Sequence, residues 1–207
     1  YQDEVKNLLT KMACGIKTLY SVRGFFPEKT RFFLLNALVI SHLRYPSVLL
    51  NGITENLLAT LEKQLNWAIK ACFSRSKFDH SSDLKIYYNI LPVRVFLQYK
   101  SVVYFWKLRH GILPAFAEVK PTTGAIKNQK RTNKLYVNLP QESIIMKNCF
   151  YNKVVLLWNT LPDKVKMKNY SYVTMKRKIK SFFLKKFAND IDTPSYSRKC
   201  WNDFRFT

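Results

Sequence analysis

Apolar residues recur at steps of three and four along most of this chain, and this spacing predicts helices rather than strands. The first apolar stripe covers residues 5–19, and Gly24 and Pro27 end it. A second helix is expected over 28–43, with Pro46 ending or kinking it. Because this segment is apolar almost all round, we expect it to be buried between neighbouring helices.

The clearest helical pattern of the sequence covers residues 55–72 and follows Thr54. Threonine accepts a hydrogen bond readily at a helix start, so Thr54 is the expected N-cap. Ser81 or Ser82 is expected to cap a short helix farther on. Pro92 suits the first turn of another helix, because proline there sacrifices no helical hydrogen bond.

The helical spacing stops at Gly111, and the lysine-rich segment 115–134 shows no period. A polar segment of this kind is typical of a connection between domains. We therefore expect a helical domain over 1–114 and a second, mostly helical domain over 135–207. Residues 135–139 alternate between apolar and polar, so at most a short β element is expected there. The predicted fold class is mainly α.

The second domain contains two further helical patterns. One covers 144–158, where Trp158 ends an apolar run and is expected to anchor the core. The other follows Ser171, its expected N-cap. Its apolar face carries Tyr172, Met175, Ile179, Phe182, Phe183 and Phe187. Its remaining positions carry the cations Lys176, Arg177, Lys178, Lys180, Lys185 and Lys186.

The two ends of the chain differ in their balance of basic and acidic residues. The net charge is +22, yet residues 1–72 hold nine basic and five acidic residues, whereas 120–186 hold sixteen basic and two acidic residues. Such a density of like charge is self-repulsive unless a polyanion neutralises it. Nucleic acid is therefore the expected partner, and the basic helix after Ser171 is the expected contact with phosphates.

A second basic cluster precedes Tyr136. Its members are Lys127, Lys130, Arg131 and Lys134. They could hold a nucleic-acid backbone while Tyr136 stacks on a base, although simple packing is the preferred interpretation of that tyrosine. For both basic segments the alternative is a solvated surface that keeps the chain soluble or serves nuclear import.

The sequence shows no constellation expected of an enzyme. Its five glycines never cluster into a phosphate-binding loop, and His42, His80 and His110 lack metal-ligand spacing. Asp190 and Asp192 are two residues apart, a spacing that does not bring side chains together on a helix. We expect no catalytic residue, metal site or cofactor in this chain.

The spacing of the cysteines and the hydropathy pattern indicate the cellular environment of the chain. Cys14, Cys72, Cys149 and Cys200 are too widely spaced for a zinc motif or a disulfide framework. They are expected to be free, buried thiols in a reducing compartment. The most apolar stretch, 32–50, is too polar to cross a membrane, so no membrane association is expected.

Several segments resemble one family of polymerases. Residues 36–72 resemble the region after the palm in reverse transcriptases of jockey-like non-long-terminal-repeat retrotransposons. The resemblance is carried by Ala37, Leu38, Val39, Ser41, His42, Leu43, Tyr45, Leu58, Leu61, Gln64, Ile69 and Lys70. Farther on, the sequence is similar to that family at Asn89-Ile90-Leu91-Pro92, Tyr99-Lys100, His110-Gly111-Ile112-Leu113-Pro114, Arg131-Thr132 and Trp158-Asn159-Thr160-Leu161-Pro162.

The resemblance implies that this chain is the carboxyl-terminal part of a retroelement polymerase, with thumb helices followed by a basic domain. The Tyr-x-Asp-Asp signature of the magnesium-dependent polymerase palm is absent from this chain. The palm would therefore precede this chain in the parent protein and would be its partner there. The implied role is noncatalytic binding of a template–primer duplex, element RNA or target DNA, in a ribonucleoprotein of nucleus and cytoplasm. A structural or protein-interaction remnant is the alternative. The chain begins with Tyr and is expected to be part of a longer protein.

Overall fold

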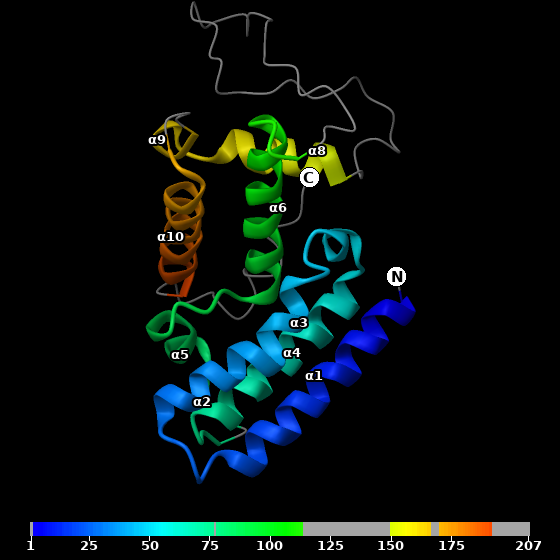
Figure 1. The fold of residues 1–207 in the computed structure, drawn as a ribbon, viewed down its shortest axis with the longest axis vertical. Helices are drawn as coiled ribbons and strands as arrows, with labels where there is room; N and C mark the ends of the chain where they lie inside the picture. Colours follow the sequence, from blue (N-terminus) through cyan, green and yellow to red (C-terminus); the bar gives the residue numbers. More distant parts are fainter. Residues whose placement is uncertain (1, 77, 114–149, 167–169, 192–207) are drawn as a thin grey trace, which may run out of the picture. The chain divides into compact units, whose positions relative to one another are not determined.

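The computed structural model describes residues 2–76, 78–113, 150–166 and 170–191. These ranges are mainly helical and contain no β-strand (Figure 1), which confirms the predicted mainly α fold. The chain divides into two compact units, Tyr1–Leu97 and Gln98–Thr207. This division falls within helix α6 (Val93–Arg109). The connection expected over 115–134 and the β element expected over 135–139 lie outside the described residues.

The first unit is built on a bundle in which three helical runs lie side by side (Figure 1). These are α1 (Gln2–Val22), the run α2 (Glu28–Leu35), η1 (Asn36–Ile40) and α3 (Ser41–Arg44), and α4 (Glu55–Cys72). A short 3-10 turn, η2 (Leu49–Gly52), precedes α4. The core takes one stripe from each run, including Val5, Met12, Leu35, Val39, Leu61, Leu65 and Ile69. These are the stripes that the apolar spacing predicts.

The second helical run differs from its prediction in two respects. It is interrupted by the π-helical turn η1, and it is not buried all round, because the Phe33 side chain is 62% exposed. The π turn lies at a close approach of α1: a Cβ atom on Gly15 would lie 2.4 Å from the carbonyl oxygen of Leu38. Glycine at position 15 is therefore required for this helix contact.

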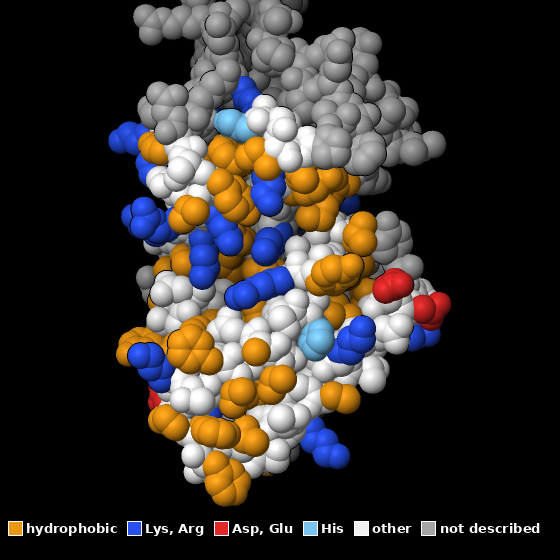
Figure 2. Space-filling model, in the orientation of Figure 1, with side chains coloured by type: hydrophobic (Ala, Val, Ile, Leu, Met, Phe, Trp, Pro, Cys, Tyr) orange, Lys and Arg blue, Asp and Glu red, His pale blue; other side chains and the backbone are white. Residues whose placement is uncertain are grey.

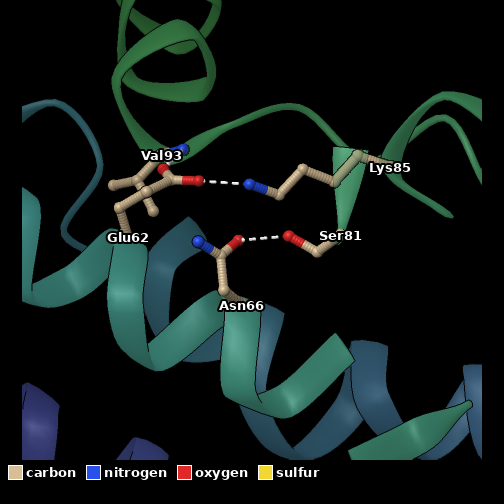
Figure 3. Close-up of polar contacts among 5 residues, drawn as sticks. All are labelled: Glu62, Asn66, Ser81, Lys85 and Val93. Atoms are coloured by element: carbon tan, nitrogen blue, oxygen red, sulfur yellow. Dashed lines mark hydrogen bonds and ion pairs between the residues drawn. The ribbon is translucent and has the colours of Figure 1, made fainter. Parts of the chain in front are cut away.

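Two residues stand at the expected N-cap positions, but their side chains make no capping hydrogen bond. Thr54 is extended before α4, but its hydroxyl makes no capping bond. Ser81 precedes α5 (Ser82–Tyr87) and likewise makes no cap. Its hydroxyl instead donates to Oδ1 of Asn66 at 3.0 Å, so tertiary contact replaces the local hydrogen bond (Figure 3).

A carboxylate links three elements of the first unit (Figure 3). Glu62 on α4 forms an ion pair with Lys85 of α5 and accepts the backbone N–H of Val93 at 2.5 Å. The Lys85 side chain is 6% exposed and the Glu62 side chain is 19% exposed, so the lysine is buried and its carboxylate partner is partly accessible. Because the first N–H groups of a helix have no partner within it, Glu62 also satisfies the start of α6.

The described part of the second unit comprises the remainder of α6, α8 (Phe150–Thr160), α9 (Asp163–Lys166) and α10 (Tyr172–Ile191). Trp158 is fully buried, and its ring centroid lies 5.5 Å from that of Phe105. This confirms its predicted core role. Gly111, with a φ of +67°, ends α6 in the left-handed conformation that favours glycine.

The expectation that the cysteines are buried is wrong for one of them. Cys14 and Cys72 are both free, but Cys14 is exposed rather than buried, because it lies on the outer face of α1. Burial raises the pKa of the Cys72 thiol to about 12. Cys149 and Cys200 lie outside the described residues.

Candidate nucleic-acid interface

Helix α10 presents two faces from one continuous segment. Its first turn is closed as predicted, since Ser171 Oγ accepts the backbone N–H of Thr174 at 3.4 Å. The buried face consists of Met175, Ile179, Phe183 and Phe187. Tyr172 and Phe182, which were expected on the same face, are half-buried.

The cations predicted to contact nucleic acid lie outside the buried face of α10. Lys176, Arg177, Lys185 and Lys186 are exposed, and Lys178 and Lys180 are half-buried. Figure 2 shows Lys and Arg side chains over α10 and α6 on the face in view, with no Asp or Glu side chain among them. Apolar packing on one face of the helix thus leaves the charged groups toward solvent.

Aromatic rings accompany these cations. The Lys178 Nζ atom lies 3.5 Å from the ring centroid of Tyr170. From α6, Lys107 Nζ lies 4.7 Å from the ring centroid of Tyr172. That ring also stacks on Trp106, with 5.9 Å between centroids. Cation–π contacts of this kind position an ammonium group without neutralising its charge.

Lys107 and Tyr170 were not among the residues predicted to bind nucleic acid. The tertiary structure brings Lys107 to the start of α10, although 65 positions separate it from Tyr172 in the sequence. No local pattern predicts such a contact. Tyr170 could have been noticed, because it directly precedes the predicted cap Ser171.

Two cations of this unit have structural surroundings. Arg109 Cζ lies 5.5 Å from the ring centroid of the buried Trp158, and burial lowers the pKa of Arg109. Lys166 is almost fully buried; its Nζ donates to the Asn159 carbonyl at 2.9 Å and lies 3.7 Å from Asp163 Oδ1. Burial lowers the pKa of Lys166, and Asp163 opposes that effect. Lys166 therefore joins α8 to α9 and is not available to bind a phosphate.

The other predicted cluster cannot be placed. Lys127, Lys130, Arg131 and Lys134 lie outside the described residues, as does Tyr136. Among the described residues, no group of three or more His, Cys, Asp or Glu side chains could hold a metal ion. Asp190 is on α10, and Asp192 lies outside the described residues.

No helix in the described ranges is both long and apolar enough to cross a membrane. The arrangement in the second unit is thus a basic helix on an aromatic core, with Lys107 and Lys178 held against the half-buried rings of Tyr172 and Tyr170. Comparison with known proteins returns no matching family model, curated protein or solved structure.

Proposed function

We propose that this chain is a noncatalytic nucleic-acid-binding module that contacts phosphates through helix α10. The observation that carries the proposal is the division of this helix into a buried apolar face and a surface with six cations. A duplex backbone carries regularly spaced negative charge, and each phosphate that is neutralised releases counterions. Contact of this kind is tolerant of sequence, because it does not read base edges.

The surroundings of α10 favour the same function. Phe183 and Phe187 hold the helix on its unit, so its cations are presented from a fixed support. The contacts of Lys107 and Lys178 with tyrosine rings restrict their positions without cancelling their charge. Less conformational entropy is then lost when a phosphate binds.

The sequence resemblance suggests the context of this module. We infer that it is the carboxyl-terminal part of a retroelement polymerase, with the palm as an upstream partner. Its ligand would be the template–primer duplex, the element RNA or the target DNA. The purified chain is not expected to incorporate nucleotides on a primed RNA template with magnesium. Incorporation that disappears when Asp190 and Asp192 are replaced by Asn would contradict the noncatalytic role.

The decisive experiment compares two variants from which four cations are removed. The test variant carries Lys176→Gln, Arg177→Gln, Lys178→Gln and Lys180→Gln. The control carries Lys6→Gln, Lys11→Gln, Lys29→Gln and Arg75→Gln, which are exposed positions of the first unit. Both lose the same formal charge, so the comparison separates a local interface from the effect of net charge.

Binding to a plain DNA duplex is titrated at several salt concentrations. If about six phosphates are contacted, the wild-type affinity falls with a logarithmic salt slope of roughly −5. We expect a weaker and less salt-dependent complex for the α10 variant than for the control. Equal behaviour of the two variants, or a wild-type affinity independent of salt, would refute the proposal and favour a solubilising or import surface.

A further inference from the structure

A surface groove of about 440 Å³ lies in the first unit between α1 and α4. Its lining comes from one face of each helix: Ala13, Ile16, Lys17, Tyr20, Ser21, Gln64 and Trp67. This volume is within the range of sites for small organic groups, roughly 300–1,000 Å³. No carboxylate is among these lining residues.

Two aromatic residues that line the groove are exposed. The Tyr20 side chain is 56% exposed and that of Trp67 is 49% exposed. Their sequence neighbours Leu19 and Ala68, which point about 100° away around the same helices, are almost fully buried and face the core. Neither ring is therefore needed to fill the core, and both present apolar area to solvent.

A cation stands beside each ring. Arg23 Cζ lies 3.7 Å from the ring centroid of Tyr20, and Lys63 Nζ lies 5.6 Å from that of Trp67. Lys17 adds a third positive charge at the groove itself. The groove thus combines flat apolar surfaces with positive charge and no opposing carboxylate among its lining residues.

We propose that this groove binds an unpaired segment of nucleic acid, with a base stacked on Trp67 or Tyr20 and the neighbouring phosphates beside Lys17, Arg23 and Lys63. Aromatic side chains within a basic groove bind single strands in this way, because every base has a stacking face and the backbone follows the charge. A base within a duplex has its faces covered by its neighbours, so this site selects unpaired strands. It is separate from α10 in residues and in the part of the ligand that it contacts.

Charge distinguishes this occupant from an apolar protein segment. A purely apolar partner would gain nothing from Lys17, Arg23 and Lys63 and would have to desolvate them. A nucleic-acid strand supplies both a planar apolar group and an anion at each repeat. The bases of nucleic acid match the exposed rings of the groove, and its phosphates match the cations.

The test uses the full chain and two oligonucleotides of equal length: oligothymidylate and an oligomer that is abasic throughout. Both carry the same phosphates, so the ratio of their affinities reports base stacking alone. We expect the wild type to prefer oligothymidylate by about 5- to 150-fold, since stacking contributes about 1–3 kcal/mol per base. Trp67→Leu should remove most of this preference, whereas Trp67→Phe should retain part of it.

Tyr45→Leu is the matched control, because Tyr45 is an exposed aromatic residue of the same unit that does not line the groove. Circular dichroism verifies that each variant is folded. Binding should also quench tryptophan fluorescence in the wild type more strongly than in the Trp67→Phe variant. A wild type that binds neither oligomer, or both equally, would overturn the inference. So would a Trp67→Leu variant with the full preference, because the bases would then stack at another site.

This experiment is independent of the α10 interface. The four-residue α10 variant should lose affinity for both oligomers by a similar factor and keep the ratio between them. Conversely, Trp67→Leu should leave affinity for a blunt duplex unchanged. Failure of one prediction therefore does not entail failure of the other.

Discussion

The two units of this protein hold their positive charges in different ways. Tyr1–Leu97 contains thirteen basic and seven acidic residues, whereas Gln98–Thr207 contains twenty-two and six. In the first unit, carboxylates pair with cations between elements, as Glu62 does with Lys85 and Glu55 with Arg94. In the second, Lys107 and Lys178 contact aromatic rings.

This difference indicates what each kind of contact does. An ion pair between elements satisfies both charges and specifies how the elements dock. A cation–π contact fixes the position of the cation but leaves its charge able to act on an external anion. The groove cations of the first unit, Arg23 and Lys63, belong to the second type. The type of partner and its burial thus separate structural positions from candidate binding positions: Arg109, which contacts the buried ring of Trp158, is structural.

The largest expected effect tests the buried face of α10. Phe183 is 3% exposed, so Phe183→Ala removes an aromatic side chain from the core of the second unit. We expect the free energy of unfolding to fall by about 3–5 kcal/mol, with a lower melting temperature. Hydrogen exchange should accelerate in peptides of α8 and α10. A melting temperature equal to that of the wild type would show that this face is not a core.

The next effect tests the buried ion pair of the first unit. Glu62→Gln retains an oxygen that can accept the Val93 N–H but leaves Lys85 without a charged partner. We expect a loss of about 3 kcal/mol in unfolding free energy, because an uncompensated charge remains buried. Adding Lys85→Met should recover most of it. If the double variant melts no higher than Glu62→Gln alone, the stabilising role assigned to the pair is wrong.

A smaller effect is expected at the helix contact of Gly15. Alanine favours helices over glycine by up to about 1 kcal/mol, yet its Cβ atom would collide with the Leu38 carbonyl. Because overpacking costs about 1–3 kcal/mol, Gly15→Ala should be destabilising by about 1 kcal/mol. Gly24→Ala is the control, since nothing lies within 4 Å of a Cβ atom there. Chemical denaturation of both variants measures the difference, and a stabilised Gly15→Ala would refute the close approach.

The smallest effect on stability per substituted residue is expected where the effect on binding is largest. Replacing Lys176, Arg177, Lys178 and Lys180 by Gln leaves the buried face of α10 intact. The free energy of unfolding should change by no more than about 0.5 kcal/mol per site. Thermal melting run beside the duplex titrations checks this. If the variant unfolds at the assay temperature, the cations of α10 are structural and the comparison between the two units fails.

Local pattern was sufficient to predict most helices of this protein. The stripes of α1, α4 and α10 are visible in the sequence because one face of each helix packs on a core, which imposes a period of 3.6 residues. The stop at Gly111 follows from its backbone freedom. The division of α10 into an apolar face and cations was predictable for the same reason.

Tertiary structure alone decided how individual side chains are used. Ser81 makes a contact with Asn66 instead of a cap, and Lys85 is buried because Glu62 lies opposite it. Lys107 approaches α10, and Tyr20 and Trp67 share one groove. All of these depend on residues distant in sequence. Periodicity records which face of a helix is buried, but not what lies against it, because many partners satisfy the same apolar stripe.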